Sequence, residues 1–228
     1  MRAQGNGLAL ALVISAILGV SSVCTAASAD EIARTAQLLG IGINAEMAVA
    51  EVGAGSGETA RAVAERIAPG GRLYATELDP EALAKLRKAL SGLPNVTVLE
   101  AGIADTRLPD DCCDVIFMEA VYHHFSKPAQ IDASLLRALR PGGRLVVIDF
   151  PPTIWLSPWT PDDVPANRGG HGIPAQILID ELTQAGFEAV SLDEHWSNGW
   201  LGQHYFAAVF RKPMRAGALP SHQERTSS

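Results

Sequence analysis

Short apolar runs alternate with segments of helical periodicity along most of the chain. Continuous apolar runs of this length are typical of buried strands, and five occur, at residues 47–52, 73–78, 96–99, 115–118 and 145–150. Helical patterns lie between and after them, at residues 58–67, 80–90, 131–139 and 178–185. Two more strands are predicted near the C-terminus, at residues 189–192 and 205–210. Strands that alternate with helices in this way predict a parallel sheet with helices on both faces.

Two of the predicted helices have boundaries marked by single residues. Asp79 precedes Pro80, and an acidic residue followed by proline is typical of a helix N-terminus. The buried stripe of that helix is expected at Leu83, Leu86 and Leu90. The helix that contains Leu139 is expected to stop at residues 141–143, Pro-Gly-Gly.

The first 29 residues have the pattern of a secretory signal peptide. Arg2 is followed by an apolar stretch at residues 8–20, and Ala-Ser-Ala at residues 27–29 precedes Asp30. An uncleaved anchor in the inner membrane is the alternative, and only in that case would the protein contact a membrane. Both readings place the rest of the chain outside the cytoplasm, in the periplasm or the extracellular space.

The rest of the chain divides into one domain, residues 30–212, and a polar tail, residues 213–228, which we expect to be unstructured. The 228 residues are 47% apolar and 19% charged, which excludes a disordered or fibrous protein. The formal net charge is −7 and no basic run occurs, so nucleic acid is not an expected partner. Three cysteines and no CxxC pair exclude a disulfide framework, and adjacent Cys112 and Cys113 are expected to be small buried side chains rather than a disulfide.

A glycine-rich loop follows the first predicted strand. Gly53, Gly55 and Gly57 form GxGxG, which differs from the GxGxxG of dinucleotide-binding folds, and no lysine follows to make a P-loop. Glu51 lies just before the loop, where it would repel a pyrophosphate but attract a cationic amino group. Glu77 ends the second strand, 20 residues after Gly57, where a carboxylate can bind ribose hydroxyls. A tight turn that needs glycine only for its geometry is the alternative.

Three parts of the chain together resemble the class I methyltransferases that depend on S-adenosylmethionine. They are residues 51–57, Glu77, and the run from Leu108 through Tyr-His-His-Phe at residues 122–125 to Gly143. The resemblance covers about residues 35–210, and it is nearest to a bacterial group of exported methyltransferases. It implies a Rossmann-like α/β fold, with a mostly parallel seven-stranded sheet in the order 3-2-1-4-5-7-6, an antiparallel last strand, and helices on both faces.

The same resemblance implies which residues hold S-adenosylmethionine. Glu51 would reach the amino group of the methionine part, Glu77 the ribose, and Asp105 the adenine amino group, with Ile103 against the ring. The full set implied for the cofactor is Glu51, Gly53, Ala54, Gly55, Gly57, Glu77, Leu78, Ile103, Asp105 and Glu119.

Two adjacent histidines follow the fourth strand, at the sheet edge where ligands bind in open α/β folds. His123 or His124 could act as a general base if the methyl acceptor is a hydroxyl or an amine. The alternative is that one caps a helix and the other packs under the cofactor. No metal site is expected, because adjacent side chains tend to diverge and no His-x-x-x-His pattern or carboxylate pair completes one.

The segment Phe150–Gly172 is expected to contact the methyl acceptor, because a long ordered loop beside a cleft is more often functional than idle. Its tryptophans suggest a small, apolar or flat acceptor. The candidate acceptor-binding residues are Tyr122, Trp155, Trp159 and His171, with Asp149 as a further polar group near the cleft. A non-catalytic protein that binds a nucleoside on the same scaffold is the alternative function. A nicotinamide-dependent oxidoreductase is disfavoured by the GxGxG spacing and by Glu51.

Overall fold

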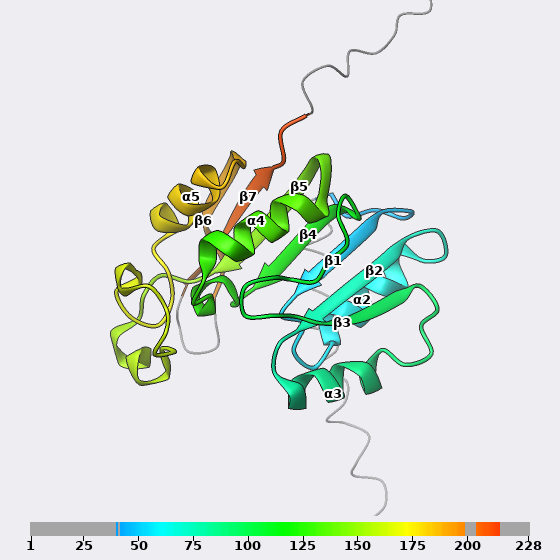
Figure 1. Cartoon of the computed structure of the whole chain (residues 1–228), viewed down its shortest axis with the longest axis horizontal. Coiled ribbons are helices and arrows are strands. Elements are labelled where there is room, and N and C mark those ends of the chain that lie inside the picture. The colour runs from blue at the N-terminus through cyan, green and yellow to red at the C-terminus, as the bar shows by residue number, and fades with distance from the viewer. Residues whose placement is uncertain (1–39, 41, 199–203, 215–228) are drawn as a thin grey trace, which may run out of the picture.

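Seven strands form one mixed sheet in the order β3-β2-β1-β4-β5-β7-β6, as the resemblance implied. The computed structural model describes residues 40, 42–198 and 204–214 (Figure 1). Only β7 runs against its neighbours β5 and β6. The strands are β1 (Ala48–Val52), β2 (Arg72–Glu77), β3 (Val96–Glu100), β4 (Cys113–Glu119), β5 (Leu139–Asp149), β6 (Glu188–Asn198) and β7 (His204–Arg211).

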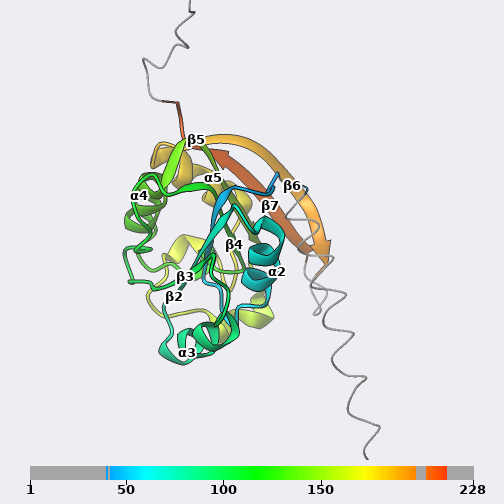
Figure 2. The same cartoon turned by 90° about the vertical axis from the view of Figure 1, so that its right-hand side faces the viewer.

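Helices cover both faces of the sheet, with α4 and α5 on one side and α2 on the other (Figure 2). Side chains alternate along a strand, so Val115 and Phe117 of β4 join the core under α2 and α3, whereas Ile116 and Met118 join the core under α4 and α5. The continuous apolar runs in the sequence reflect this two-sided burial. The helices are α2 (Glu58–Ile67), α3 (Pro80–Ala89), α4 (Pro128–Ala138) and α5 (Ala175–Gln184), with 3-10 turns η1 (Tyr122–His124), η2 (Ile154–Trp159) and η3 (Ala166–Arg168).

The start of α3 is the one that the sequence predicted. The Asp79 carboxylate accepts a hydrogen bond from the backbone N–H of Ala82 at 2.8 Å, and Pro80 takes the first helical position, where no N–H is needed. The predicted apolar stripe is buried, with Leu86 completely enclosed. This helix fixes the chain direction directly after Glu77.

The boundary at Leu139 differs from the prediction. α4 ends at Ala138, and Leu139 already belongs to β5, where it pairs with Cys113. Gly142 continues the strand, because its N–H bonds to the carbonyl of Lys212 beside β7 at 2.9 Å. Pairing with a strand that lies 70 residues away in the sequence extends β5 through a Pro-Gly-Gly segment that would otherwise form a turn.

Cys112 and Cys113 are both buried, as predicted, but their sulfur atoms form a vicinal disulfide, so the expectation of free thiols was wrong. The disulfide lies where the chain enters β4. Among the described helices, none combines the length and apolarity needed to cross a membrane. The predicted signal peptide at residues 1–29 and the tail from residue 215 onward lie outside the described residues.

Candidate functional site

A cavity of about 470 Å³ opens at the carboxyl ends of the parallel strands. Ligands of open α/β sheets bind at this edge, and the volume suits a nucleoside-sized molecule. The loops that follow β1, β2, β3 and β4 all contribute to it. Representative lining residues are Gly53, Glu77, Leu78, Ile103, Val121 and His124.

Each glycine of the loop after β1 has a positive φ, but the three have different surroundings. A side chain at Gly53 would collide with Val121, and one at Gly57 would lie 2.7 Å from the buried Leu86 of α3, so these two glycines allow close packing. At Gly55, by contrast, nothing lies within 4 Å of the position of a side chain. Open space beside a left-handed glycine leaves its backbone accessible to a ligand. The side chain of Ala54 is 7% exposed and belongs to the core, so only its backbone could meet the cofactor.

Glu77 is held in place by three backbone N–H groups. Its Oε2 accepts from Gly55 at 2.9 Å, and its Oε1 accepts from Leu78 at 2.7 Å and from Asp79 at 3.0 Å. A carboxylate has about four acceptor positions, so one remains for a ribose hydroxyl in this arrangement. Glu77 therefore links the glycine loop to the start of α3 and also lines the cavity.

Three glutamates lie at the carboxyl ends of neighbouring strands and form an acidic group: Glu51, Glu77 and Glu119. Glu51 is 7% exposed, and its Oε2 is buried without a hydrogen-bond partner among the described residues. Burial, followed by the negative charges of Glu119 and Glu77, raises the pKa of Glu51 well above its ordinary value. A cationic ligand would satisfy the buried oxygen and reduce the repulsion among the carboxylates.

Two large apolar side chains on the cavity wall are exposed. Leu78, after β2, is 51% exposed and Ile103, after β3, is 54% exposed. Both line the cavity, so an aromatic ring bound there would cover apolar surface that otherwise faces water.

Asp105 does not join the residues that line the cavity in the described part of the chain. Its Oδ1 accepts from the backbone N–H of Arg107 at 2.7 Å, and its Oδ2 forms an ion pair with Arg137 at 2.9 Å. These two contacts hold the Asp105 carboxylate beside Arg107 and Arg137, and the adenine contact implied by the resemblance stays a prediction.

His123 forms a buried pair with Asp149, at the end of β5. The Nδ1 atom of His123 lies 2.8 Å from Oδ1 of Asp149, and the two side chains are 2% and 0% exposed. Asp149 also accepts the backbone N–H groups of His123 and Phe150. The carboxylate therefore fixes the orientation of the His123 ring. The other ring nitrogen, Nε2, does not take part in this contact.

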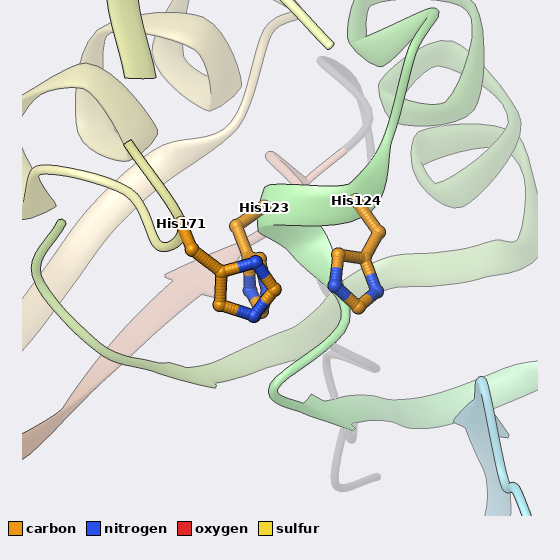
Figure 3. A group of neighbouring side chains, drawn as sticks. All are labelled: His123, His124 and His171. Carbon is orange, nitrogen blue, oxygen red and sulfur yellow. The ribbon is translucent and has the colours of Figure 1, made fainter. Parts of the chain in front are cut away.

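His124 and His171 lie against His123 (Figure 3). The ring centroids of His123 lie 4.0 Å from His124 and 4.7 Å from His171. Figure 3 shows one ring nitrogen of His124 on the side that faces the other two rings. Burial, then the neighbouring His123 and His171, lowers the pKa of His124 to about 4, so the ring is neutral at pH 7. The prediction that His123 or His124 is a general base stays a prediction.

His171 is placed by a closed loop. Thr153 and His171 form an isolated antiparallel bridge, with the N–H of Thr153 bonded to the carbonyl of His171 at 2.9 Å. At Gly172, φ is 118°, and a side chain there would lie 2.7 Å from the carbonyls of Phe150 and Pro151. Only glycine fits this close approach, so Gly172 lets the backbone that carries His171 pack against the end of β5.

Tyr122 is not available to an acceptor, which corrects the sequence-based expectation. Its side chain is completely buried, and its hydroxyl lies 3.0 Å from both Asp132 Oδ2 and Glu181 Oε2. Arg168 of η3 forms two hydrogen bonds of 2.9 Å with Glu181. This network fastens the loop to α4 and α5, and sequence reasoning missed it because its members are scattered over four elements. The side chains of Trp155 and Trp159 lie outside the described part of the chain.

Comparison with known proteins shows which family this chain resembles. Residues 50–147 match the family described as the methyltransferase domain. The match covers somewhat less than half of the chain. An uncharacterized methyltransferase of Mycobacterium bovis is 33% identical over 121 residues, which cover 53% of this chain and 41% of that protein. The chain thus spans less than half the length of the first curated relatives that it matches.

Solved structures, among them a methyltransferase, share the fold of this chain. A SAM-dependent methyltransferase from Aquifex aeolicus superimposes with a TM-score of 0.63 and 23% identity, over 78% of this chain and 88% of that one. A protein of Bordetella parapertussis named as a possible exported protein gives a TM-score of 0.58 and 19% identity, over 82% of this chain and 68% of that one. The predicted Rossmann-like methyltransferase fold is confirmed.

Proposed function

We propose that this protein transfers the methyl group of S-adenosylmethionine to a small-molecule acceptor. The observation that carries the proposal is the acidic group at this edge of the sheet, of which Glu77 lines the cavity and buried Glu51 has an oxygen without a partner among the described residues. S-adenosylmethionine brings two positive charges, an ammonium and a sulfonium, to this position. A nicotinamide dinucleotide would bring a pyrophosphate, which the negative charge of this acidic group repels.

The shape of the cavity supports the same cofactor. Gly55 offers an accessible backbone beside Glu77, and Leu78 and Ile103 offer exposed apolar surface for an adenine ring. The acceptor atom, which receives the methyl group, would then approach from the side of His124, a residue that lines the cavity. Because methyl transfer is an in-line displacement on a sulfonium, placing the two reactants accounts for much of the catalysis.

The acceptor is proposed to be a small molecule that enters between η1 and the loop over residues 150–172. This loop is tied to the body of the domain by Arg168, and it carries His171 beside His124, which lines the cavity. No basic surface run in the sequence suggests a nucleic acid as the acceptor.

Export is proposed from the signal-peptide pattern of residues 1–29. The vicinal disulfide supports it, since disulfides persist in oxidising compartments. The mass of the protein recovered from expressing cells tests this point. A loss that corresponds to the first 29 residues supports cleavage and export, and an intact mass in the membrane fraction supports the anchor instead.

Calorimetric titration with S-adenosylmethionine and S-adenosylhomocysteine, in the presence of a chelator, tests the cofactor. The informative variant is Gly55→Ala, and Gly92→Ala is its matched control. Both glycines have positive φ, 53° and 86°, and open space at the side-chain position, but Gly92 lies in the turn after α3. Each substitution costs about 1–2 kcal/mol of backbone strain.

We expect Gly55→Ala to weaken binding of both compounds about tenfold or more, because the new methyl group occupies the space proposed for the ligand. Gly92→Ala should bind them like the wild type. Equal effects of the two variants, or no binding by the wild type at millimolar ligand, would refute the proposed cofactor site. Binding without methyl transfer to any acceptor in a small-molecule screen would favour the non-catalytic alternative.

A further inference from the structure

Three of the six histidines of the chain meet at one point. His123 and His124 come from η1, and His171 comes from the loop after β5, 47 residues further along the chain. One ring nitrogen of each lies within 4.8 Å of the nitrogens of the other two (Figure 3). The sequence argument against a metal site was that adjacent histidines diverge, and in η1 they do not.

The second observation is the state of His123. Its Nδ1 lies 2.8 Å from Oδ1 of buried Asp149, which holds the ring in one orientation. In the tautomer whose Nδ1 donates to the carboxylate, the lone pair lies on Nε2. The Nε2 atom is buried, as is the whole side chain, which is only 2% exposed. It has no hydrogen-bond partner among the described residues. A buried polar atom without a partner costs about 1–3 kcal/mol unless a ligand satisfies it.

We propose that His123, His124 and His171 bind one divalent transition-metal ion, with Zn²⁺ as the probe that tests it. Three imidazoles suit borderline cations such as Zn²⁺, whereas Mg²⁺ and Ca²⁺ require oxygen ligands. Metal-binding histidines commonly donate their second N–H to a carboxylate, which is what Asp149 accepts here. Three protein ligands leave a fourth position open, as in catalytic zinc sites.

Binding requires only a local contraction of the group. Three nitrogens around one tetrahedral Zn²⁺, each at about 2.0–2.1 Å, lie about 3.3 Å apart. The separations of up to 4.8 Å thus have to shorten by about 1.5 Å at most. His124 supplies that freedom, since part of its side chain faces solvent while His123 is fixed by Asp149.

The position of the site gives the ion a role. His124 also lines the cavity, so an acceptor oxygen, nitrogen or sulfur could take the open coordination position beside the methyl donor. The three histidines would then bind the metal ion, and the ion would bind the acceptor. This role rests on the proposed function, whereas metal binding itself does not.

Zinc titration of the full chain tests the site, after treatment with a chelator and with no cofactor present. A chromophoric chelator as competitor gives the affinity and the stoichiometry, and Co²⁺ substitution gives the coordination number from its visible absorption. The variants are His124→Ala and His171→Ala, with Asp149→Asn to test the orientation of His123. The matched control is His195→Ala, because His195 and His204 form a separate pair with ring centroids 6.0 Å apart in the last hairpin.

We expect one Zn²⁺ per chain and the absorption of four- or five-coordinate Co²⁺. Each loss of a ligand should weaken zinc binding by more than 100-fold, and Asp149→Asn by about 10- to 100-fold. His195→Ala should leave the affinity unchanged. Absence of a one-to-one complex would overturn the proposal, as would binding that survives both ligand variants or disappears with His195→Ala. Since the cofactor titration contains chelator and the zinc titration contains no cofactor, each proposal fails or succeeds separately.

Discussion

Replacing Glu77 with alanine removes a carboxylate that has both a structural and a proposed binding role. The structural part comes from three backbone N–H groups, of which that of Gly55 is partly buried and those of Leu78 and Asp79 are exposed. Water replaces the acceptor at the exposed groups. The partly buried bond to a charged acceptor dominates, so the free energy of unfolding should fall by about 1.5–3 kcal/mol. For a domain of this size that lowers Tm by about 3–12 °C.

The binding part is a further charge-assisted hydrogen bond, to a ribose hydroxyl. Losing it should weaken the affinity for S-adenosylhomocysteine by about 10- to 150-fold, which corresponds to about 1.5–3 kcal/mol. Calorimetry well below the Tm of the variant separates this effect from instability.

Glu100→Ala is the matched control. Glu100 is the register partner of Glu77 in the adjacent β3, and its side chain is exposed. We expect this variant to change neither Tm nor affinity. If Glu77→Ala lowers Tm but changes the affinity less than threefold, Glu77 is purely a structural residue and the ribose contact is wrong.

Three more predictions concern the protonation of Glu51 and of Asp132 and the close packing of the backbone at Gly172. Because the pKa of Glu51 is raised, cofactor binding near neutral pH should release a proton, seen as a binding enthalpy that differs between phosphate and Tris buffers. Glu51→Gln should abolish that difference, and its persistence would contradict the contact with the ammonium group. Burial and, less strongly, Glu181 raise the pKa of Asp132 to about 7 against the lowering effects of Tyr122 and Arg168, so its protonated form stabilises the fold. This stabilisation is complete below about pH 4 and is lost as the pH rises through about 7, so Asp132→Asn should gain stability relative to the wild type from about pH 5 to pH 8 in urea unfolding; a pH-independent difference would refute the raised pKa. Gly172→Ala should lower the free energy of unfolding by about 2 kcal/mol or more, whereas Gly169→Ala, which also has a positive φ but only ordinary contacts, should cost about 1 kcal/mol; equal costs would refute the close approach.

Most of the fold could be predicted from the sequence. Helix caps and glycine turns mark the ends of elements, and the burial of the sheet on both faces gives its strands continuous apolar runs. The cap at Asp79 and the limits of α2 depend on neighbouring residues, and the structure confirms both. Leu139 was assigned to the wrong element, since its pairing with Cys113 is a contact between distant parts of the chain.

The candidate site divides in the same way. Glu51 and Glu77 lie at the same edge of the sheet, near the ends of their strands. The alternation of strands with helices and the distance of Glu77 from the glycine loop along the sequence both predict this. The meeting of His171 with His123 depends on the path of the loop after β5, and no short-range pattern records that path. The burial of Tyr122 depends on Asp132 and Glu181 of two different helices, so a residue beside two candidate catalytic histidines was assigned to the acceptor when it belongs to the core.

The bridge between Thr153 and His171 has a consequence for how this protein could diversify. It brings together the two ends of a segment of 17 residues, 154–170, next to the end of β5. The entropy of closing a loop changes only slowly with its length, by about 0.6 kcal/mol for each doubling. A longer, shorter or foreign segment could therefore replace the part of this loop before Arg168, while the bridge keeps β5 and His171 in register and Arg168 keeps its pair with Glu181. The segment is in effect an exchangeable module, in which a new acceptor preference can arise without redesign of the sheet that holds the cofactor.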